Sequence, residues 1–209
     1  MKLAILGATG STGKLLVQQA LGAGHHVVAF ARTPSKLGIE HEHLDMVQGD
    51  VQDAEQVANA IAGTEAVLSV LGPTSNEPAY EVSKGMVNIL AAMEKHGVRR
   101  LIQTVGAGVG DSRDEPGLFD RMIKVLLKLA SRHVFEDMVR VNDIIRASDL
   151  DWTLVRVPML TDEPPAGDVK VGYLGKGVGS RISRADIAAF MLKQADSDTY
   201  LRQAPVISN

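Results

Sequence analysis

The sequence predicts an α/β protein built on a doubly wound, parallel β-sheet. Short apolar runs alternate along the chain with longer stretches of helical periodicity, which is the pattern of βαβ units. A glycine-rich segment directly follows the first apolar run, where such a sheet has its first turn into a helix. The length of 209 residues is typical of one domain, and we expect residues 1–209 to form a single domain.

The apolar runs are short enough for buried strands, and the periodic stretches are long enough for helices. The predicted strands cover residues 3–6, 27–30, 44–47, 66–70, 100–104 and 152–155. The predicted helices cover residues 12–23, 54–62, 80–96 and 119–148, and we expect the last one to break near Ser131 or His133. Right-handed crossovers between successive strands then give the doubly wound sheet.

The pattern changes after the sixth predicted strand. Residues 158–167 are rich in proline and predict a loop, residues 169–173 predict a short strand, and Ser183 is the expected N-cap of a last helix that ends near residue 194. Because open α/β sheets bind ligands at the carboxyl ends of their strands, we expect residues 158–209 to form a small substrate-side lobe of the same domain. Arg156, before this lobe, faces either a cofactor or a structural carboxylate.

Two further segments carry expectations about burial. Residues 111–117 contain Asp, Arg, Pro and Gly and are interpreted as a surface loop. The stripe formed by Met122, Val125, Leu126 and Leu129 has the spacing of a buried helix face, which is more often part of the core than an interface, although a partner helix could also use it.

The composition excludes several classes of protein. The chain has 22 Lys and Arg against 25 Asp and Glu, a formal net charge of −3, which is too balanced for a nucleic-acid partner. It has no cysteine, so disulfides, thiolate metal sites and thiol nucleophiles are absent, and the histidines offer no third ligand beside His41 and His43. The first apolar run ends at Gly7, too early for a signal region or a membrane span. We expect a cytoplasmic protein without metal or membrane partner.

Gly7, Gly10 and Gly13 stand between the first predicted strand and the first predicted helix. At such a position, glycines allow a tight turn, a close approach of the backbone to a pyrophosphate, and close packing of helix on strand. The free N–H groups and the dipole of the helix N-terminus attract the anion. The motif therefore predicts a dinucleotide site of the Rossmann type. A Walker loop is disfavoured, because Leu15 stands where that motif has Ser or Thr.

The end of the second predicted strand indicates which dinucleotide is bound. NAD-specific sites place an Asp or Glu there to hold the ribose 2′-hydroxyl, but this chain has Arg32 and then Lys36, with no carboxylate between them. A guanidinium and an ammonium favour a 2′-phosphate. We therefore predict NADP(H) as the cofactor.

With these residues in view, the chain resembles the atypical short-chain dehydrogenase/reductases, in particular the NmrA-like branch that includes flavin reductases of the biliverdin reductase B type. The resemblance extends over nearly the whole chain. Its supporting segments are residues 7–13, 28–37, 49–51, 70–72, 88–93, 96–98, 180–183, 186 and 190–192.

The resemblance implies a role for residues along the whole strand edge. The glycine loop would hold the pyrophosphate, Arg32 and Lys36 the 2′-phosphate, Asp50 and Val51 the adenine, and Leu71 and Gly72 the ribose. The segments 104–106 and 158–160 would surround the nicotinamide. The full set of expected cofactor-binding residues is Gly7, Thr9, Gly10, Ser11, Thr12, Gly13, Arg32, Lys36, Asp50, Val51, Leu71, Gly72, Thr104, Val105, Gly106, Pro158, Met159 and Leu160.

The catalytic residues stay unknown at this point. Carbonyl reductases of the superfamily use a Tyr-x-x-x-Lys pair after the fifth strand, whereas Tyr80 and Lys84 follow the fourth, so we interpret their spacing as a coincidence. The Ser and His that the flavin reductases carry after the fifth and sixth strands correspond here to Gly106 and Met159. A hydride acceptor that delocalises negative charge needs orientation more than an acid. The residues that could line an apolar platform for it are Gly106, Gly108, Gly110, Met159 and Leu160, with Phe119 or Met122 as further candidates.

The sequence thus favours an NADPH-dependent reductase that acts on a planar redox acceptor such as a flavin or quinone, without the Ser-Tyr-Lys triad. A non-catalytic NADP(H)-binding redox sensor or regulator of NmrA-like type is the alternative. A sugar-nucleotide epimerase is disfavoured by the short segment after Val157. The expected partner is a small-molecule acceptor, and the expected assembly is a monomer or a weak homodimer.

Overall fold

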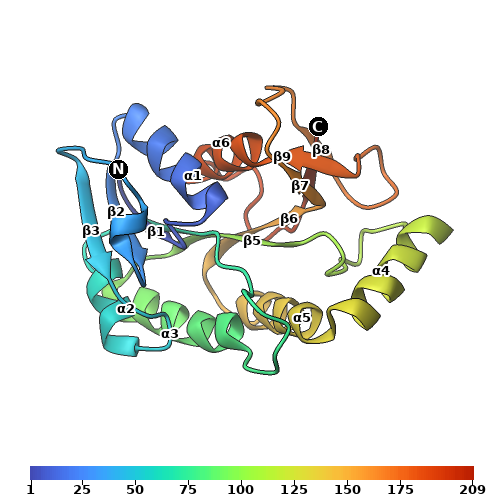
Figure 1. The fold of residues 1–209 in the computed structure, drawn as a ribbon, viewed down its shortest axis with the longest axis horizontal. Helices are drawn as coiled ribbons and strands as arrows, with labels where there is room; N and C mark the ends of the chain where they lie inside the picture. Colours follow the sequence, from blue (N-terminus) through green and yellow to red (C-terminus); the bar gives the residue numbers. More distant parts are fainter.

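The structure, a computed structural model, has three layers: helices cover both faces of one large sheet (Figure 1). It describes residues 1–209 apart from the side chains of residues 119, 120, 123, 124 and 127. The strands are β1 (Lys2–Leu6), β2 (His26–Ala31), β3 (Leu44–Gln48), β4 (Ala66–Ser69), β5 (Arg100–Gly106), β6 (Asp151–Val157), β7 (Met159–Thr161), β8 (Lys170–Gly172), β9 (Arg181–Ser183) and β10 (Val206–Ser208). The helices are α1 (Ser11–Gly22), the short 3-10 helix η1 (Pro34–Lys36), α2 (Ala54–Ile61), α3 (Glu81–His96), α4 (Leu118–Ala130), α5 (Arg132–Arg146) and α6 (Arg184–Lys193).

The main sheet has the strand order β3-β2-β1-β4-β5-β6-β10-β8. β8 runs antiparallel to β10, and the other pairs are parallel, with Leu3 of β1 opposite Val27 of β2 and Ala66 of β4. The chain order reverses between β1 and β4, which is the switch point where doubly wound sheets bind ligands. The predicted Rossmann-like fold class is therefore confirmed.

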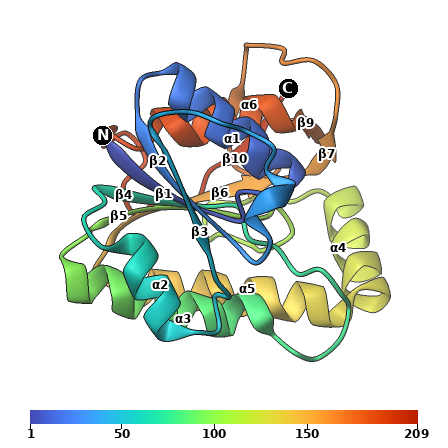
Figure 2. The ribbon, with the colours of Figure 1, turned by 60° about the vertical axis from the view of Figure 1, so that its left-hand side comes forward.

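The central strands β1, β2, β4, β5 and β6 are buried on both faces, which explains why they appear in the sequence as largely apolar runs. Along β1, Ala4 and Leu6 pack into the cluster under α2, α3 and α5, whereas Leu3 and Ile5 pack into the cluster under α1 and α6. Figure 2 shows these two helical layers on opposite sides of the sheet. The carboxyl ends of the strands remain uncovered by this packing and can carry a site.

The predicted strands and helices agree with the structure to within one or two residues at most ends, and the long last helix breaks at Ser131, the N-cap of α5. Ser183 caps α6, since its hydroxyl accepts a hydrogen bond from the Asp186 N–H. The prediction of an uninterrupted loop over residues 158–167 was wrong: β7 forms there and pairs with β9. Strands of three residues, such as β7, β9 and β10, are too short to show a period in the sequence.

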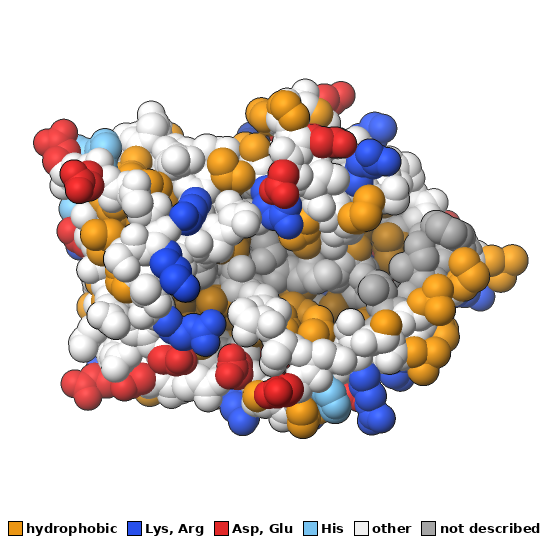
Figure 3. Space-filling model, in the orientation of Figure 1, with side chains coloured by type: hydrophobic (Ala, Val, Ile, Leu, Met, Phe, Trp, Pro, Cys, Tyr) orange, Lys and Arg blue, Asp and Glu red, His pale blue; other side chains and the backbone are white. Residues whose placement is uncertain are grey.

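The helix face expected to be buried is instead exposed. Met122, Val125, Leu126 and Leu129 are 52%, 57%, 56% and 76% exposed. α4 lies at one end of the molecule, beyond the helices that cover the sheet, and hydrophobic side chains spread over this end in Figure 3. α5 takes the place under the sheet instead, with Val141 and Ile145 fully buried. Phe119, a further candidate for the acceptor platform, lies outside the described side chains.

In the described part of the chain, no helix has both the length and the apolar character needed to cross a membrane.

Candidate functional site

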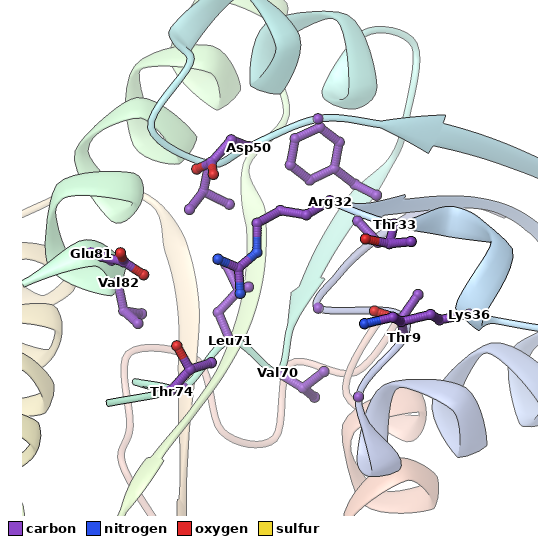
Figure 4. A pocket seen from close by; sticks show the side chains of 17 residues that line it. Thr9, Arg32, Thr33, Lys36, Asp50, Val70, Leu71, Thr74, Glu81 and Val82 are labelled. Carbon is purple, nitrogen blue, oxygen red and sulfur yellow. The ribbon is translucent and has the colours of Figure 1, made fainter. Parts of the chain in front are cut away.

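A cavity of about 280 Å³ lies at the carboxyl edge of the sheet, at the switch point between β1 and β4. Its walls are the glycine loop after β1, the turn after β2, the segment after β3, the loop after β4 and the first turn of α3 (Figure 4). Segments that are far apart in the sequence meet here because parallel strands end at the same edge.

The glycine loop turns tightly and leads into an uncapped helix. Gly7 has a φ of +82°, a conformation that favours glycine, and the Gly10 N–H donates to the Gly7 carbonyl over 3.1 Å. Gly10 is the N-cap of α1, has no side chain to cap the helix, and is followed by a first turn without acidic residues. The N–H groups of this turn are therefore available to an anion at the positive end of the helix dipole.

The two cations expected at the 2′-phosphate line the cavity together. Arg32 precedes η1 in the turn after β2, and Lys36 is the last residue of η1; both are exposed, and Leu37 anchors the turn in the core. Figure 4 shows both side chains projecting into the cavity. Within the part of the chain that the structure describes, neither side chain forms an ion pair, so both charges are free to meet a phosphate.

The remaining walls are held by side chains from neighbouring elements. The Asn88 amide of α3 donates to the Val51 carbonyl over 2.8 Å. The Gln103 amide of β5 donates to the Leu71 carbonyl over 3.3 Å. These bonds fix the backbone of two lining segments, although neither amide lines the cavity.

Of the cofactor-binding residues expected from the sequence, nine line the cavity. These are Gly7, Thr9, Gly10, Arg32, Lys36, Asp50, Val51, Leu71 and Gly72. The others are not among its lining residues: Ser11, Thr12 and Gly13 begin α1, and Thr104, Val105, Gly106, Pro158, Met159 and Leu160 lie at the ends of β5 and β6 and in β7.

The second group nevertheless shares the same sheet edge. Gly106 is in register with Val157, and the Ala107 N–H donates to the Val157 carbonyl over 2.8 Å, so the segments after β5 and β6 leave the sheet side by side. Met159 is 60% exposed there, which gives this edge an apolar surface.

The cavity also contains residues that the sequence analysis did not select. They are Phe30, Ala31, Thr33, Gly49, Val70, Thr74, Glu81 and Val82. Thr33 and Gly49 are sequence neighbours of Arg32 and Asp50, which were selected. The position of these turns directly after β2 and β3 could therefore have identified them. Glu81 and Val82 had no such signal, because only the packing of α3 brings its first turn to the cavity.

Tyr80 is directed away from the cavity, toward α5. Its hydroxyl donates to the Glu136 carboxylate over 2.8 Å, and the Arg140 guanidinium lies 3.7 Å from its ring centroid. The hydrogen bond to Glu136 raises the pKa of Tyr80 above its usual value, the opposite of what an activated catalytic tyrosine needs. The geometry agrees with a coincidental spacing of Tyr80 and Lys84.

Arg156 faces a structural carboxylate. Its side chain is fully buried, and its two terminal nitrogens donate to the two Asp114 oxygens over 2.7 Å each. Nearby, Arg146 donates to Asp111 over 2.6 Å. Residues 111–117 form the expected surface loop, in which Ser112, Arg113, Glu115 and Gly117 are exposed. The side chains of Asp111 and Asp114 are only 1% and 6% exposed, and they anchor this loop to the protein.

Asp111 makes the stability depend on pH. Burial alone would raise its pKa, but hydrogen bonds from Arg146 and Arg113 lower the pKa from its usual 3.8 to about 2. The unfolded chain therefore takes up this proton first as the pH falls, and stability is lost between about pH 4 and about pH 2. Above this pH window, we expect the ionised Asp111 to contribute on the order of 2 kcal/mol to the free energy of unfolding. Denaturant unfolding of the wild type and Asp111→Asn at several pH values measures it; a difference between them that stays constant through the window would contradict the assignment.

The chain matches known proteins over nearly its whole length. The model of the NAD(P)H-binding family matches residues 7–198. Among curated proteins, it is similar to the oxidoreductase aflX of Aspergillus parasiticus, with 28% identity over 218 residues that cover 94% of this chain and 78% of that protein.

Solved structures share the fold. The oxidoreductase ylbE from Lactococcus lactis superposes with a TM-score of 0.83 at 20% identity, over 100% of this chain and 91% of that one. A short-chain dehydrogenase/reductase from Veillonella parvula in complex with NADP superposes with a TM-score of 0.80 at 22% identity, over 100% and 94% of the two chains.

Proposed function

Since this chain belongs to the NAD(P)H-binding family, we propose that it is an oxidoreductase that uses NADPH and passes a hydride to a planar redox acceptor such as a flavin or quinone. The observation that carries the choice of NADPH is the pair of unpaired cations, Arg32 and Lys36, in the cavity beside the glycine loop. The relative from Veillonella parvula that was solved with NADP supports the same choice.

The residues of the cavity fit such a dinucleotide in order along the sheet edge. The uncapped first turn of α1 would hold the pyrophosphate, Arg32 and Lys36 the 2′-phosphate, and the segment at Asp50 and Val51 the adenine. Leu71 and Gly72 would contact the ribose. The nicotinamide would then lie toward Gly106 and Met159, at the ends of β5 and β6.

The acceptor side determines what chemistry is possible. NADPH, when bound, supplies a hydride, and a flavin or quinone that receives it delocalises the negative charge and takes its proton from water. The residues at the ends of β5 and β6 therefore need only to orient the acceptor and exclude competing reactions. Gly106 leaves room for a flat ring, and the exposed Met159 and Leu160 offer it an apolar surface.

Removing the Arg32 side chain is expected to weaken NADPH binding selectively. Loss of a charge-assisted phosphate contact costs about 1.5–3 kcal/mol, so the Kd for NADPH should rise about 10- to 100-fold in Arg32→Ala while the Kd for NADH stays nearly constant. Titration of the intrinsic nicotinamide fluorescence measures both constants. Lys95→Ala, which removes an exposed cation at the far end of α3, is the control. Equal NADPH affinities for Arg32→Ala and Lys95→Ala would contradict the assignment.

Turnover separates the reductase from a redox sensor. Loss of the reduced-nicotinamide absorbance is followed with FMN, riboflavin or a simple quinone as acceptor, and with NADH in place of NADPH as the cofactor control. The proposal expects NADPH-selective consumption. The sensor alternative is favoured by Gly106 and Met159, which stand where flavin reductases of the resembled branch have polar groups. If it holds, NADPH should raise the melting temperature while no acceptor is reduced.

A further inference from the structure

The loop over residues 107–117, which leaves β5 at the nicotinamide end of the proposed site, is attached to a turn of the C-terminal lobe at residues 173–176. We propose that this turn is a positioning element for the acceptor: it holds the β5 loop in place as one wall of the acceptor side, and Gly175 is the residue that permits the contact. The role in acceptor binding rests on the proposed function, whereas the attachment of loop to turn does not.

A buried ion pair forms the base of the attachment. The Asp114 carboxylate accepts hydrogen bonds from both terminal nitrogens of Arg156, and it accepts a third from the N–H of Leu174 over 3.1 Å. Arg156 in turn donates to the Val109 carbonyl over 3.2 Å and to the Ala204 carbonyl over 2.7 Å. One side chain of β6 therefore binds the β5 loop at two points, while Asp114 connects that loop to the turn.

The backbones of loop and turn also meet directly. The Glu115 N–H donates to the Leu174 carbonyl over 2.8 Å. Gly175 has a φ of +80°, and a Cβ on it would overlap the Glu115 carbonyl oxygen. At the first residue of the turn, the Arg113 guanidinium lies 4.3 Å from the centroid of the Tyr173 ring. Residues of the lobe thus contact the loop at Arg113, Asp114 and Glu115.

This attachment reaches the strand end where the acceptor would bind. Between Gly106 and the ion pair, the loop is fixed by the Ala107 N–H to the Val157 carbonyl and by the Val109 N–H to the Gly106 carbonyl. Ala107 and Val109 are buried, so a shift at Asp114 is transmitted to the backbone beside Gly106. The cavity at the glycine loop shares none of these residues. Displacing the turn should therefore affect the acceptor and leave NADPH binding unchanged.

Gly175, in the turn, and Gly177, directly after it, provide a matched test. Gly175 and Gly177 both have positive φ, +80° and +74°, so alanine strains the backbone similarly at either position, but a Cβ on Gly177 meets no atom within 4 Å. In the full chain, Gly175→Ala should raise the KM for FMN or quinone about fivefold or more and accelerate amide hydrogen exchange in residues 107–117, with the Kd for NADPH within about twofold of the wild type. Gly177→Ala should change neither the KM nor the exchange.

The outcomes separate the inference from the proposed function. Equal exchange in residues 107–117 for Gly175→Ala and Gly177→Ala would overturn the attachment, and a parallel loss of NADPH affinity would overturn the acceptor-side role. A wild type that reduces no acceptor would refute the proposed reductase, while the exchange measurement would still decide whether the turn holds the loop. If Gly175→Ala does not fold, Tyr173→Leu decides the same question through faster exchange in the loop, because it removes the ring contact of the turn with Arg113 and keeps the hydrogen bond from Arg113 to Asp111 within the loop.

Discussion

Gly13→Ala is expected to abolish tight NADPH binding, because the glycine loop has no space for a side chain at this position. A Cβ on Gly13 would overlap the carbonyl oxygen of Gly7 and lie 2.9 Å from both the Cα and the carbonyl carbon of Ala8. All of these are backbone atoms, so the loop must open to admit the methyl group. A distortion of about 3 kcal/mol corresponds to about a 100-fold increase in the Kd for NADPH.

Gly22→Ala is the matched control for this prediction. Gly22 ends the same helix, α1, and a Cβ there meets no atom within 4 Å, so alanine should leave both stability and affinity near those of the wild type. NADPH titration reports the affinity, and the melting temperature measured without NADPH reports the stability, so the two effects are separated. Near wild-type affinity in Gly13→Ala would mean that the dinucleotide does not depend on this loop.

Asp114→Ala is expected to destabilise the fold by about 3–5 kcal/mol, because it leaves a fully buried guanidinium without its counter-ion. The pKa of Asp114 is already informative: burial alone would raise it, yet the hydrogen bonds from Arg156 hold it below its usual value. At about 2–4 °C per kcal/mol for a chain of this size, the melting temperature should fall by about 10 °C.

The neighbouring residue provides the control. Glu115 pairs with Lys176 at 2.9 Å, but both side chains are largely exposed, so Glu115→Ala should cost less than about 1 kcal/mol. Thermal unfolding of the two variants compares a buried with an exposed ion pair in the same loop. Equal losses of stability would show that Arg156 finds another partner when Asp114 is removed.

The sequence alone determined the features that depend on local pattern. The alternation of apolar runs with helical periodicity predicted the sheet and its layers, because a strand buried on both faces must be apolar throughout. The glycine spacing at Gly7, Gly10 and Gly13, and the cations Arg32 and Lys36, sit within a few residues of a strand end. Since all parallel strands end at one edge, their position along the chain already fixed their side of the molecule.

Only the tertiary structure decided the features that depend on contacts distant in sequence. The partner of Arg156 is 42 residues away, and the first turn of α3 reaches the cavity only through the packing of that helix. The apolar spacing on α4 was compatible with burial, yet α5 occupies the face of the sheet and α4 remains exposed. The periodicity of apolar residues predicts which side chains share one face of a helix. Which element covers that face depends on the free energy of packing the whole chain.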